Sequence, residues 1–192
     1  MENPSRAKEI RVTFEKLRDL NGIDTLPAIE YASLQFNCLT VIDGLAANHK
    51  LIEVDLASNR IAKYSCLSKL KWLRYIDLER NQVEEMAPLV ADNLEVLILR
   101  HNKIADIRGL DSARNLRRLD LSNNNVQNIN GLDNLCFLDE LNIAYNRLTK
   151  LQGIGQCLLL RKLDLSNNRL KSMDRLIMMF LNELDLRNNQ LE

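Results

Sequence analysis

An asparagine recurs along this chain at a nearly constant spacing. Eight asparagines have similar surroundings and are separated by 22 residues, except for two steps of 21: Asn37, Asn59, Asn81, Asn102, Asn124, Asn146, Asn168 and Asn189. A fixed period of this kind indicates that one structural unit is stacked many times, each unit contacting its neighbours. The chain is therefore expected to form a single repeat solenoid.

Aliphatic residues hold fixed places before each asparagine. Residues 116–126 read LRRLDLSNNNV and residues 138–148 read LDELNIAYNRL, and both fit LxxLxLxxNx followed by an aliphatic residue. The apolar fourth and sixth positions have the period of two expected for a short strand with one buried face. The asparagine that follows can bond backbone groups of its turn and of the neighbouring coil. The second half of each repeat, such as residues 129–132 (INGL), is too short for more than a turn or a brief helix.

The two ends of the chain depart from this regularity. Near the N-terminus, Ile10, Val12 and Leu17 occupy aliphatic places, but Glu15 stands where an asparagine is expected. We therefore expect residues 1–28 to form an irregular capping repeat and residues 29–192 to form eight regular repeats in one continuous domain. The sequence stops at Glu192 inside the regular pattern, so an uncapped C-terminal end is expected, through which the chain could associate with itself.

Composition and charge exclude several classes of function. The chain is 46% hydrophobic, and Lys plus Arg equal Asp plus Glu at 26 each, so no net field favours nucleic acid or an anionic membrane. Residues 1–10 contain no apolar run, which argues against a signal peptide or a membrane span. The cysteines are spread singly, at Cys38, Cys66, Cys136 and Cys157. This spacing favours an intracellular, cytoplasmic location, with a cytoskeletal or nuclear one still open.

The repeats resemble the leucine-rich-repeat family, in the short 22-residue class typified by the nuclear regulatory subunit of protein phosphatase 1. The resemblance covers nearly the whole chain and includes an aliphatic-x-Gly-aliphatic segment at residues 20–23, 42–45, 107–110, 129–132 and 151–154. It implies an α/β, right-handed solenoid with a curved parallel sheet on the concave face and short turns or brief helices on the convex face. Cys66, Pro88 and Arg175 replace the glycine in three repeats, so the backbone is expected to differ there.

Members of this class serve as phosphatase regulators, spliceosomal proteins, dynein-associated proteins and ciliary or centriolar scaffolds. The resemblance therefore implies a protein-protein interaction scaffold or targeting domain that binds a partner protein on its concave face. Narrower alternatives are a phosphatase regulatory subunit, a cytoskeletal, ciliary or centriolar assembly protein, and an associate of an RNA-binding protein. The non-catalytic part of a larger enzyme is a further alternative.

One candidate binding patch lies on the fourth and fifth regular repeats and their neighbours. The third, fifth, seventh and eighth residues of each repeat are expected to line the concave face, and Val96 and Ile98 are aliphatic at two of these positions. An apolar residue gains nothing from facing solvent unless a partner covers it. The patch consists of Tyr75, Val96, Ile98, Arg100, His101 and Arg118, a mixture typical of interface hot spots. Isolated apolar surface residues are also common, so that reading stays open.

A second candidate combines aromatic and acidic side chains on the N-terminal repeats. It consists of Tyr31, Phe36, Glu53, Asp55, Tyr75, Asp77 and Glu79, and Tyr145 adds an aromatic ring on a later repeat. This surface would suit a basic partner. The alternative is a solvated charged face.

The sequence offers no constellation for catalysis, a metal or a cofactor. His49 and His101 are far apart, no glycine-rich phosphate loop occurs, and no His, Cys or carboxylate spacing indicates a metal site. We therefore expect a non-enzymatic protein without a cofactor or a small-molecule substrate. A basic stretch at Arg108, Arg114, Arg117 and Arg118 is diluted by nearby aspartates, which argues against direct nucleic-acid binding.

Overall fold

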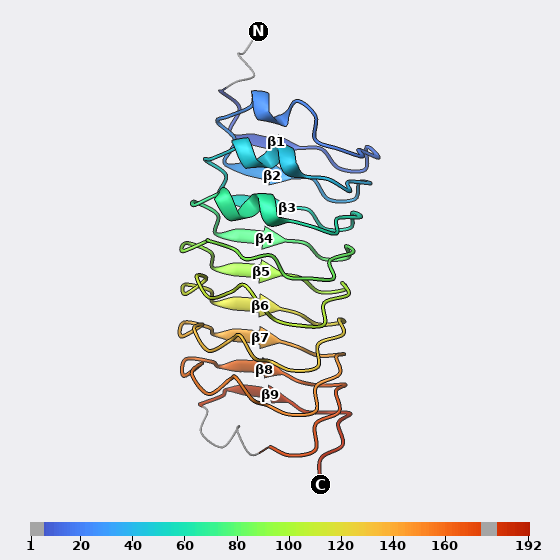
Figure 1. Ribbon diagram of the computed structural model, residues 1–192, viewed down its shortest axis with the longest axis vertical. Helices are drawn as coiled ribbons and strands as arrows, with labels where there is room; N and C mark the ends of the chain where they lie inside the picture. The colour runs from blue at the N-terminus through green and yellow to red at the C-terminus, as the bar shows by residue number, and fades with distance from the viewer. Residues whose placement is uncertain (1–5, 174–179) are drawn as a thin grey trace.

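The chain forms a solenoid of stacked coils around one parallel sheet. The computed structural model describes residues 6–173 and 180–192 (Figure 1). The strands are β1 (Glu9–Arg11), β2 (Tyr31–Ser33), β3 (Glu53–Asp55), β4 (Tyr75–Asp77), β5 (Val96–Ile98), β6 (Arg118–Asp120), β7 (Glu140–Asn142), β8 (Lys162–Asp164) and β9 (Glu183–Asp185). They follow one another in sequence order across a nine-stranded sheet. The predicted parallel-sheet solenoid is thereby confirmed.

Strand register matches the repeat period throughout the sheet. Between β4 and β5, for example, Tyr75 pairs with Val96, Ile76 with Leu97 and Asp77 with Ile98. The middle residue of each strand from β2 to β8 points into the solenoid and is buried, whereas the first and third residues face outward. Equivalent outward positions of successive repeats therefore lie side by side in columns along the concave face.

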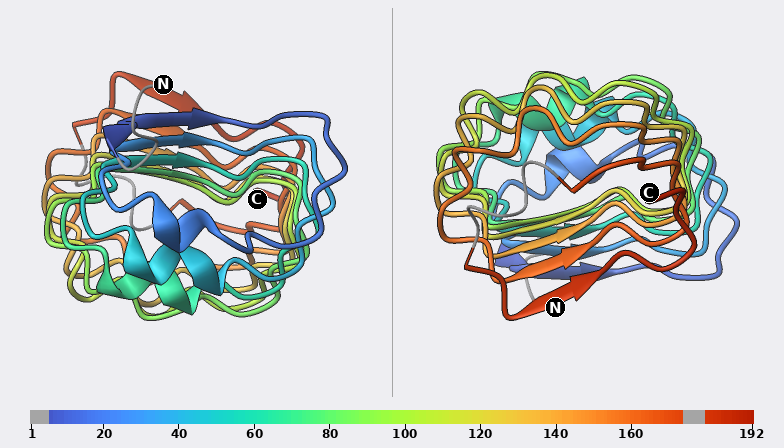
Figure 2. Two further views of the ribbon diagram at one scale, coloured as in Figure 1. Left: turned by 90° about the horizontal axis from the view of Figure 1, so that it is seen from above. Right: turned by 90° about the horizontal axis from the view of Figure 1, so that it is seen from below.

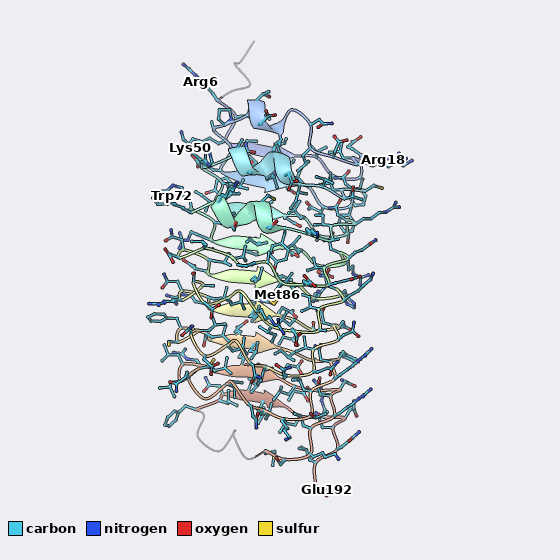
Figure 3. All side chains as sticks on the ribbon, viewed as in Figure 1. Arg6, Arg18, Lys50, Trp72, Met86 and Glu192 are labelled. Atoms are coloured by element: carbon cyan, nitrogen blue, oxygen red, sulfur yellow. The ribbon has the colours of Figure 1, made fainter. Side chains whose placement is uncertain are left out.

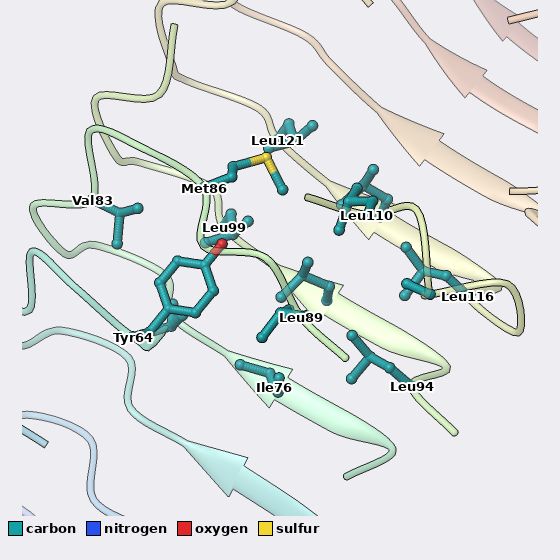
Figure 4. Close-up of a cluster of buried hydrophobic side chains, with 14 of the residues drawn as sticks. Tyr64, Ile76, Val83, Met86, Leu89, Leu94, Leu99, Leu110, Leu116 and Leu121 are labelled. Carbon is teal, nitrogen blue, oxygen red and sulfur yellow. The ribbon is translucent and has the colours of Figure 1, made fainter. Parts of the chain in front are cut away.

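The core fills the space between the sheet and the opposite wall of the coil. Figure 2 shows the strands along one side of the cross-section and the short helices on the other. Leucine and isoleucine from successive coils form a continuous buried cluster between these walls. Tyr64 is fully buried in the cluster and lies beside Val83, Met86 and Leu89 (Figure 4). Because each coil buries its apolar face only against its neighbours, stacking is what supplies the core.

The periodic asparagines form a hydrogen-bonded ladder beside the sheet, as the sequence predicted. In the fifth regular repeat, Nδ2 of Asn124 donates to the carbonyl oxygens of Leu121 (3.0 Å) and of Leu99 in the preceding coil (2.9 Å). Its Oδ1 accepts the N–H of Ile104 at 2.9 Å. The same pattern recurs at Asn59, Asn81, Asn102, Asn146 and Asn168. One amide thus satisfies backbone groups of two coils at once.

The residue before each of these asparagines has a left-handed backbone. Its φ lies between 52° and 58° at Phe36, Ser58, Arg80, His101, Asn123, Tyr145, Asn167 and Asn188. The backbone N–H of this residue donates to the next coil, as from Arg80 to the Arg100 carbonyl oxygen at 3.0 Å. Side chains at this position therefore stand at one margin of the concave face.

The convex wall changes along the chain. It carries 3-10 helices at η2 (Ile23–Thr25), η3 (Asp43–Ala47) and η4 (Ser65–Lys69), and turns in the described part that follows. Both forms were expected for so short a segment. The division into a capping repeat (1–28) and eight regular repeats (29–192) stays a prediction, and residues 1–5 and 174–179 lie outside the described residues.

Candidate protein-binding surface

The first candidate patch is assembled around β5. Register places Val96 between Tyr75 and Arg118, and Ile98 between Asp77 and Asp120. Val96, Ile98 and Tyr75 are half-buried, whereas Arg118 is exposed. The two aliphatic side chains therefore form a shallow apolar floor on the concave face, bordered by an aromatic ring and a cation.

The two remaining patch residues lie at the margin and differ in their contacts. Arg100 donates from Nη2 to Oε1 of Glu79 at 2.7 Å, and Arg80 donates from Nε to the same oxygen at 3.1 Å. Burial alone would raise the pKa of Glu79, but these two guanidinium groups outweigh it and lower the pKa. His101 is exposed in the left-handed position next to Arg100. Glu79 and Arg100 therefore largely neutralise each other's charge.

Asp77 is the most buried acidic residue of the second candidate surface. Burial raises its pKa from 3.8 to about 6, although the Glu79 N–H donates to Oδ1 at 2.8 Å and the Tyr75 hydroxyl donates to Oδ2 at 3.3 Å. Burial also raises the pKa of Tyr75, and the carboxylates of Asp77 and Asp55 add to the effect. Burial is also the main cause of the raised pKa of Asp55. A cation from a binding partner would stabilise the charged form of a carboxylate in this environment.

Three acidic side chains of this surface differ from Glu79 in their contacts. Glu53, Asp55 and Asp77 take part in no salt bridge within the described part of the chain. They lie on the neighbouring strands β3 and β4, and Tyr31 of β2 stands next to Glu53 in register. The structure therefore brings together most of the predicted aromatic and acidic group. Tyr145 is exposed beyond β7, several coils away from Tyr31 and Tyr75.

The C-terminal half of the same face has a different electrostatic character. Arg118, Glu140, Lys162 and Glu183 occupy the first position of β6 to β9 and alternate in charge. Their charged atoms lie 3.5 to 3.6 Å apart along the column. These side chains border a broad hollow, but they already pair with one another. Exposed pairs of this kind contribute little stability and leave little charge for a partner.

Exposed apolar side chains also occur around and beyond the two candidate surfaces. Phe14 and Phe36 stack with ring centroids 4.5 Å apart at the N-terminal margin. A further group lies just before the strands, at Trp72, Phe137, Leu158, Leu159 and Phe180. The sequence could have revealed this group. The position directly before the first aliphatic residue is polar in other repeats, at Lys50, Asn93 and Asn115, so an apolar residue there is an exception. Whether such an apolar side chain is exposed depends on the direction of the turn before its strand.

The described part of the chain presents no metal-binding cluster and no membrane-spanning helix. Within residues 6–173 and 180–192, no group of three or more His, Cys, Asp or Glu side chains could hold a metal ion. Over the same ranges, no helix has both the length and the apolar character needed to cross a bilayer. What the concave face does present is an apolar floor beside uncompensated acids, which suits macromolecular recognition.

Comparison with known proteins supports the assignment to leucine-rich-repeat proteins. The family model of leucine-rich repeats in two copies matches residues 92–134 and 114–156, and the single-repeat model matches residues 159–178. No curated protein sequence matches the chain.

Solved structures show the same fold. Internalin C2 from Listeria monocytogenes superposes with a TM-score of 0.87 and 25% identity over 93% of this chain and 80% of its own. A leucine-rich-repeat protein of Leptospira interrogans gives 0.87 and 23% over 96% of this chain, which spans 50% of that protein. The TLR13-ssRNA13 complex gives 0.76 and 27% over 91% of this chain and 27% of the matched chain. The leucine-rich-repeat fold is typical of protein-protein interaction domains.

Proposed function

We propose that this chain is a non-enzymatic scaffold or targeting domain that binds a partner protein on its concave face, centred on strands β4 to β6. The observation that carries the proposal is the pair Val96 and Ile98. Both outward positions of β5 are aliphatic, in the middle of a sheet that otherwise presents mainly polar and aromatic side chains there. Burial of such a floor by a partner would favour association, since apolar area removed from water contributes about 25 cal/mol per Å².

The surroundings of this floor agree with a protein partner. Tyr75 supplies an aromatic ring and Arg118 an exposed cation on either side of Val96. Aromatic residues and arginine are enriched in interface cores, where a few of them provide most of the binding energy. The acidic residues of β3 and β4 would then select the orientation of the partner by charge.

Partner capture with a matched control tests this proposal. The full chain is used as bait in an extract of its own cells, and bound proteins are identified by mass spectrometry. A Val96→Glu plus Ile98→Glu variant should lose a specific partner, because two carboxylates would enter the apolar floor. A Val41→Glu plus Val90→Glu variant carries the same chemical change at two exposed valines outside this floor and should keep that partner. Equal capture by both variants, with both folded by circular dichroism, would contradict the proposed surface.

The identity of the captured protein distinguishes the narrower roles. A phosphatase catalytic chain would support a regulatory subunit, whereas tubulin-associated or ciliary proteins would support an assembly role. An RNA-binding protein would support the third alternative, and a catalytic domain continuous with the chain would support the non-catalytic part of an enzyme. We also propose an intracellular location, supported by four cysteines that are all free thiols. Fractionation of cells that carry a tagged chain checks this location.

A further inference from the structure

A hollow with aromatic walls opens beside the proposed binding surface, at the margin where the chain enters β2 to β5. We name it the aromatic hollow. Its lining comprises Tyr31, Ile52, Glu53, Trp72, Arg74, Tyr75, Glu95 and Val96. Trp72 projects from the same edge of the solenoid as Lys50 (Figure 3), and 63% of its surface is exposed. The hollow is continuous with the apolar floor because Val96 belongs to both.

Strand register sets the order of groups inside the hollow. Tyr31, Glu53, Tyr75 and Val96 are direct neighbours on β2 to β5. Adjacent strands lie about 4.8 Å apart, so the Glu53 carboxylate stands between two tyrosine side chains. The Tyr75 hydroxyl is directed to Asp77 by a 3.3 Å hydrogen bond, which fixes one of these walls.

The charges of the hollow leave one carboxylate uncompensated. Arg74 donates from Nε and Nη2 to Glu95, so this pair is neutral as a unit. The Glu53 carboxylate lies in the electrostatic range of Arg74, but it forms no salt bridge or side-chain hydrogen bond among residues 6–173 and 180–192. Asp55 and Asp77 lie nearby on β3 and β4 and add negative potential. The hollow is therefore negative and is walled by aromatic rings.

This combination matches one class of ligand group. A cation above a tryptophan or tyrosine face is attracted by the negative face of the ring. A neutral apolar group would remove water from Glu53 without replacing it, and an anion would be repelled. From Arg118 onward the same column of side chains alternates in charge and pairs internally, so the free carboxylate and the aromatic walls occur together at the N-terminal part of the column.

We infer that the aromatic hollow receives one cationic side chain, arginine or lysine, from the partner protein. The inference rests on the proposed function and adds to it the chemistry of the partner. The partner places an apolar side chain on Val96 and Ile98 and a cationic one between Tyr31, Trp72 and Tyr75. Glu53 is the counterion of the inserted group.

Fluorescence of the protein itself can test the inference, because Trp72 is the single tryptophan of the chain. The probes are the capped peptides acetyl-Gly-Ser-Xaa-Ser-Gly-amide, with arginine, lysine, citrulline or leucine at Xaa. Citrulline has nearly the shape of arginine without its charge. The arginine or the lysine peptide should change Trp72 emission saturably, with a dissociation constant on the order of 1 mM. The citrulline and leucine peptides should produce no saturable change.

Two variants locate the effect in the hollow. Glu53→Gln keeps the size of an exposed side chain and should weaken binding of the cationic peptide about fivefold, the scale of one exposed ion pair. Glu85→Gln makes the same change at an exposed glutamate elsewhere on the solenoid and should leave binding unchanged. Equal binding of citrulline and arginine peptides, or no effect of Glu53→Gln, would overturn the inference.

The outcomes separate this inference from the proposed function. If the Val96→Glu plus Ile98→Glu variant loses its partner but no cationic peptide binds, the inference fails and the proposed function stands. If capture does not depend on the concave floor while the arginine peptide binds through Glu53, the hollow is a cation site and the proposed surface fails.

Discussion

The N-terminal and C-terminal halves of this solenoid share one repeat but differ on both faces. The N-terminal convex wall carries the 3-10 helices η2, η3 and η4, and the corresponding concave surface presents unpaired acids beside aromatic rings. The convex wall of the described C-terminal part consists of turns, and its concave surface presents alternating charges in pairs. Both differences begin near the 21-residue repeat that contains Pro88.

Glycine geometry explains the difference on the convex side. A Cβ added to Gly131 would lie 2.5 Å from the Ile107 carbonyl oxygen, and one on Gly153 would lie 2.6 Å from that of Ile129. Both residues have positive φ, 101° and 96°. In the N-terminal half, Cys66 occupies the equivalent position inside η4, where its thiol donates to the Ile42 carbonyl oxygen at 3.4 Å. The helical form thus makes room for the Cys66 side chain, whereas the turns at Gly131 and Gly153 leave no room for a Cβ.

The comparison teaches that the repeat defines the stack and leaves each face adjustable. The asparagine ladder and the inward leucines are the same in both halves. Residues outside these positions change the convex backbone and the concave charge without altering the register of the sheet. A binding surface can therefore be placed on a few coils of a uniform scaffold.

The largest expected effect concerns the feature that the two halves share. Asn59→Ala and Asn124→Ala each remove an amide that donates to the preceding coil and accepts a buried N–H, from Leu39 and Ile104 respectively. Each unsatisfied buried group costs about 1 to 3 kcal/mol, so we expect a loss of about 4 kcal/mol in both variants. Urea unfolding followed by circular dichroism measures it. A loss confined to one half would show that the ladder is not a common support.

A smaller effect should separate the halves. Gly131→Ala combines a left-handed backbone with the 2.5 Å approach to the Ile107 carbonyl oxygen, and we expect it to lower the free energy of unfolding by about 3 kcal/mol. Gly44→Ala meets Ile23 Cγ2 and the Leu20 carbonyl oxygen at 3.0 Å without a positive φ, so a loss of about 1 kcal/mol is expected. Gly155→Ala, with open space around it, is the control and should be nearly neutral. Equal losses at Gly131 and Gly44 would remove the basis of the comparison.

The sequence predicted the shared features better than the differences. The asparagine period and the alternation of aliphatic residues were enough for the sheet, its order and the ladder, because these depend on positions that every repeat repeats. The expected change of backbone at Cys66 was wrong, because η4 with Cys66 has the same 3-10 form as η3 with Gly44. The helices give way to turns at the repeat of Pro88, and the sequence did not predict that form of the change. For the candidate surface, the strand register was enough to predict the columns of outward-facing residues. The ion pair of Arg100 with Glu79 and the aromatic hollow could not be predicted, because they depend on the directions of side chains between coils.

The last prediction concerns the concave difference and uses pH. Burial raises the pKa of Asp77 from 3.8 to about 6, whereas hydrogen bonds from Arg187 lower the pKa of the half-buried Asp185. Between pH 4 and 6 the folded state therefore holds a proton on Asp77 that the unfolded chain has lost. The contribution of this group to stability is present at pH 4 and is lost as the pH rises through about 6.

An Asp77→Asn variant removes this dependence. Relative to the parent, its free energy of unfolding should increase by about 2 kcal/mol between pH 4 and pH 8, as measured by urea unfolding at several pH values. Asp185→Asn should show the opposite dependence and at lower pH, because a depressed pKa stabilises the fold above 3.8 and this contribution is lost as the pH falls below that value. An Asp77→Asn difference that is constant from pH 4 to 8 would show that this carboxylate is well solvated. In that case Asp77 would not have the raised pKa that distinguishes it from the salt-bridged Arg118, Glu140, Lys162 and Glu183 of the C-terminal half.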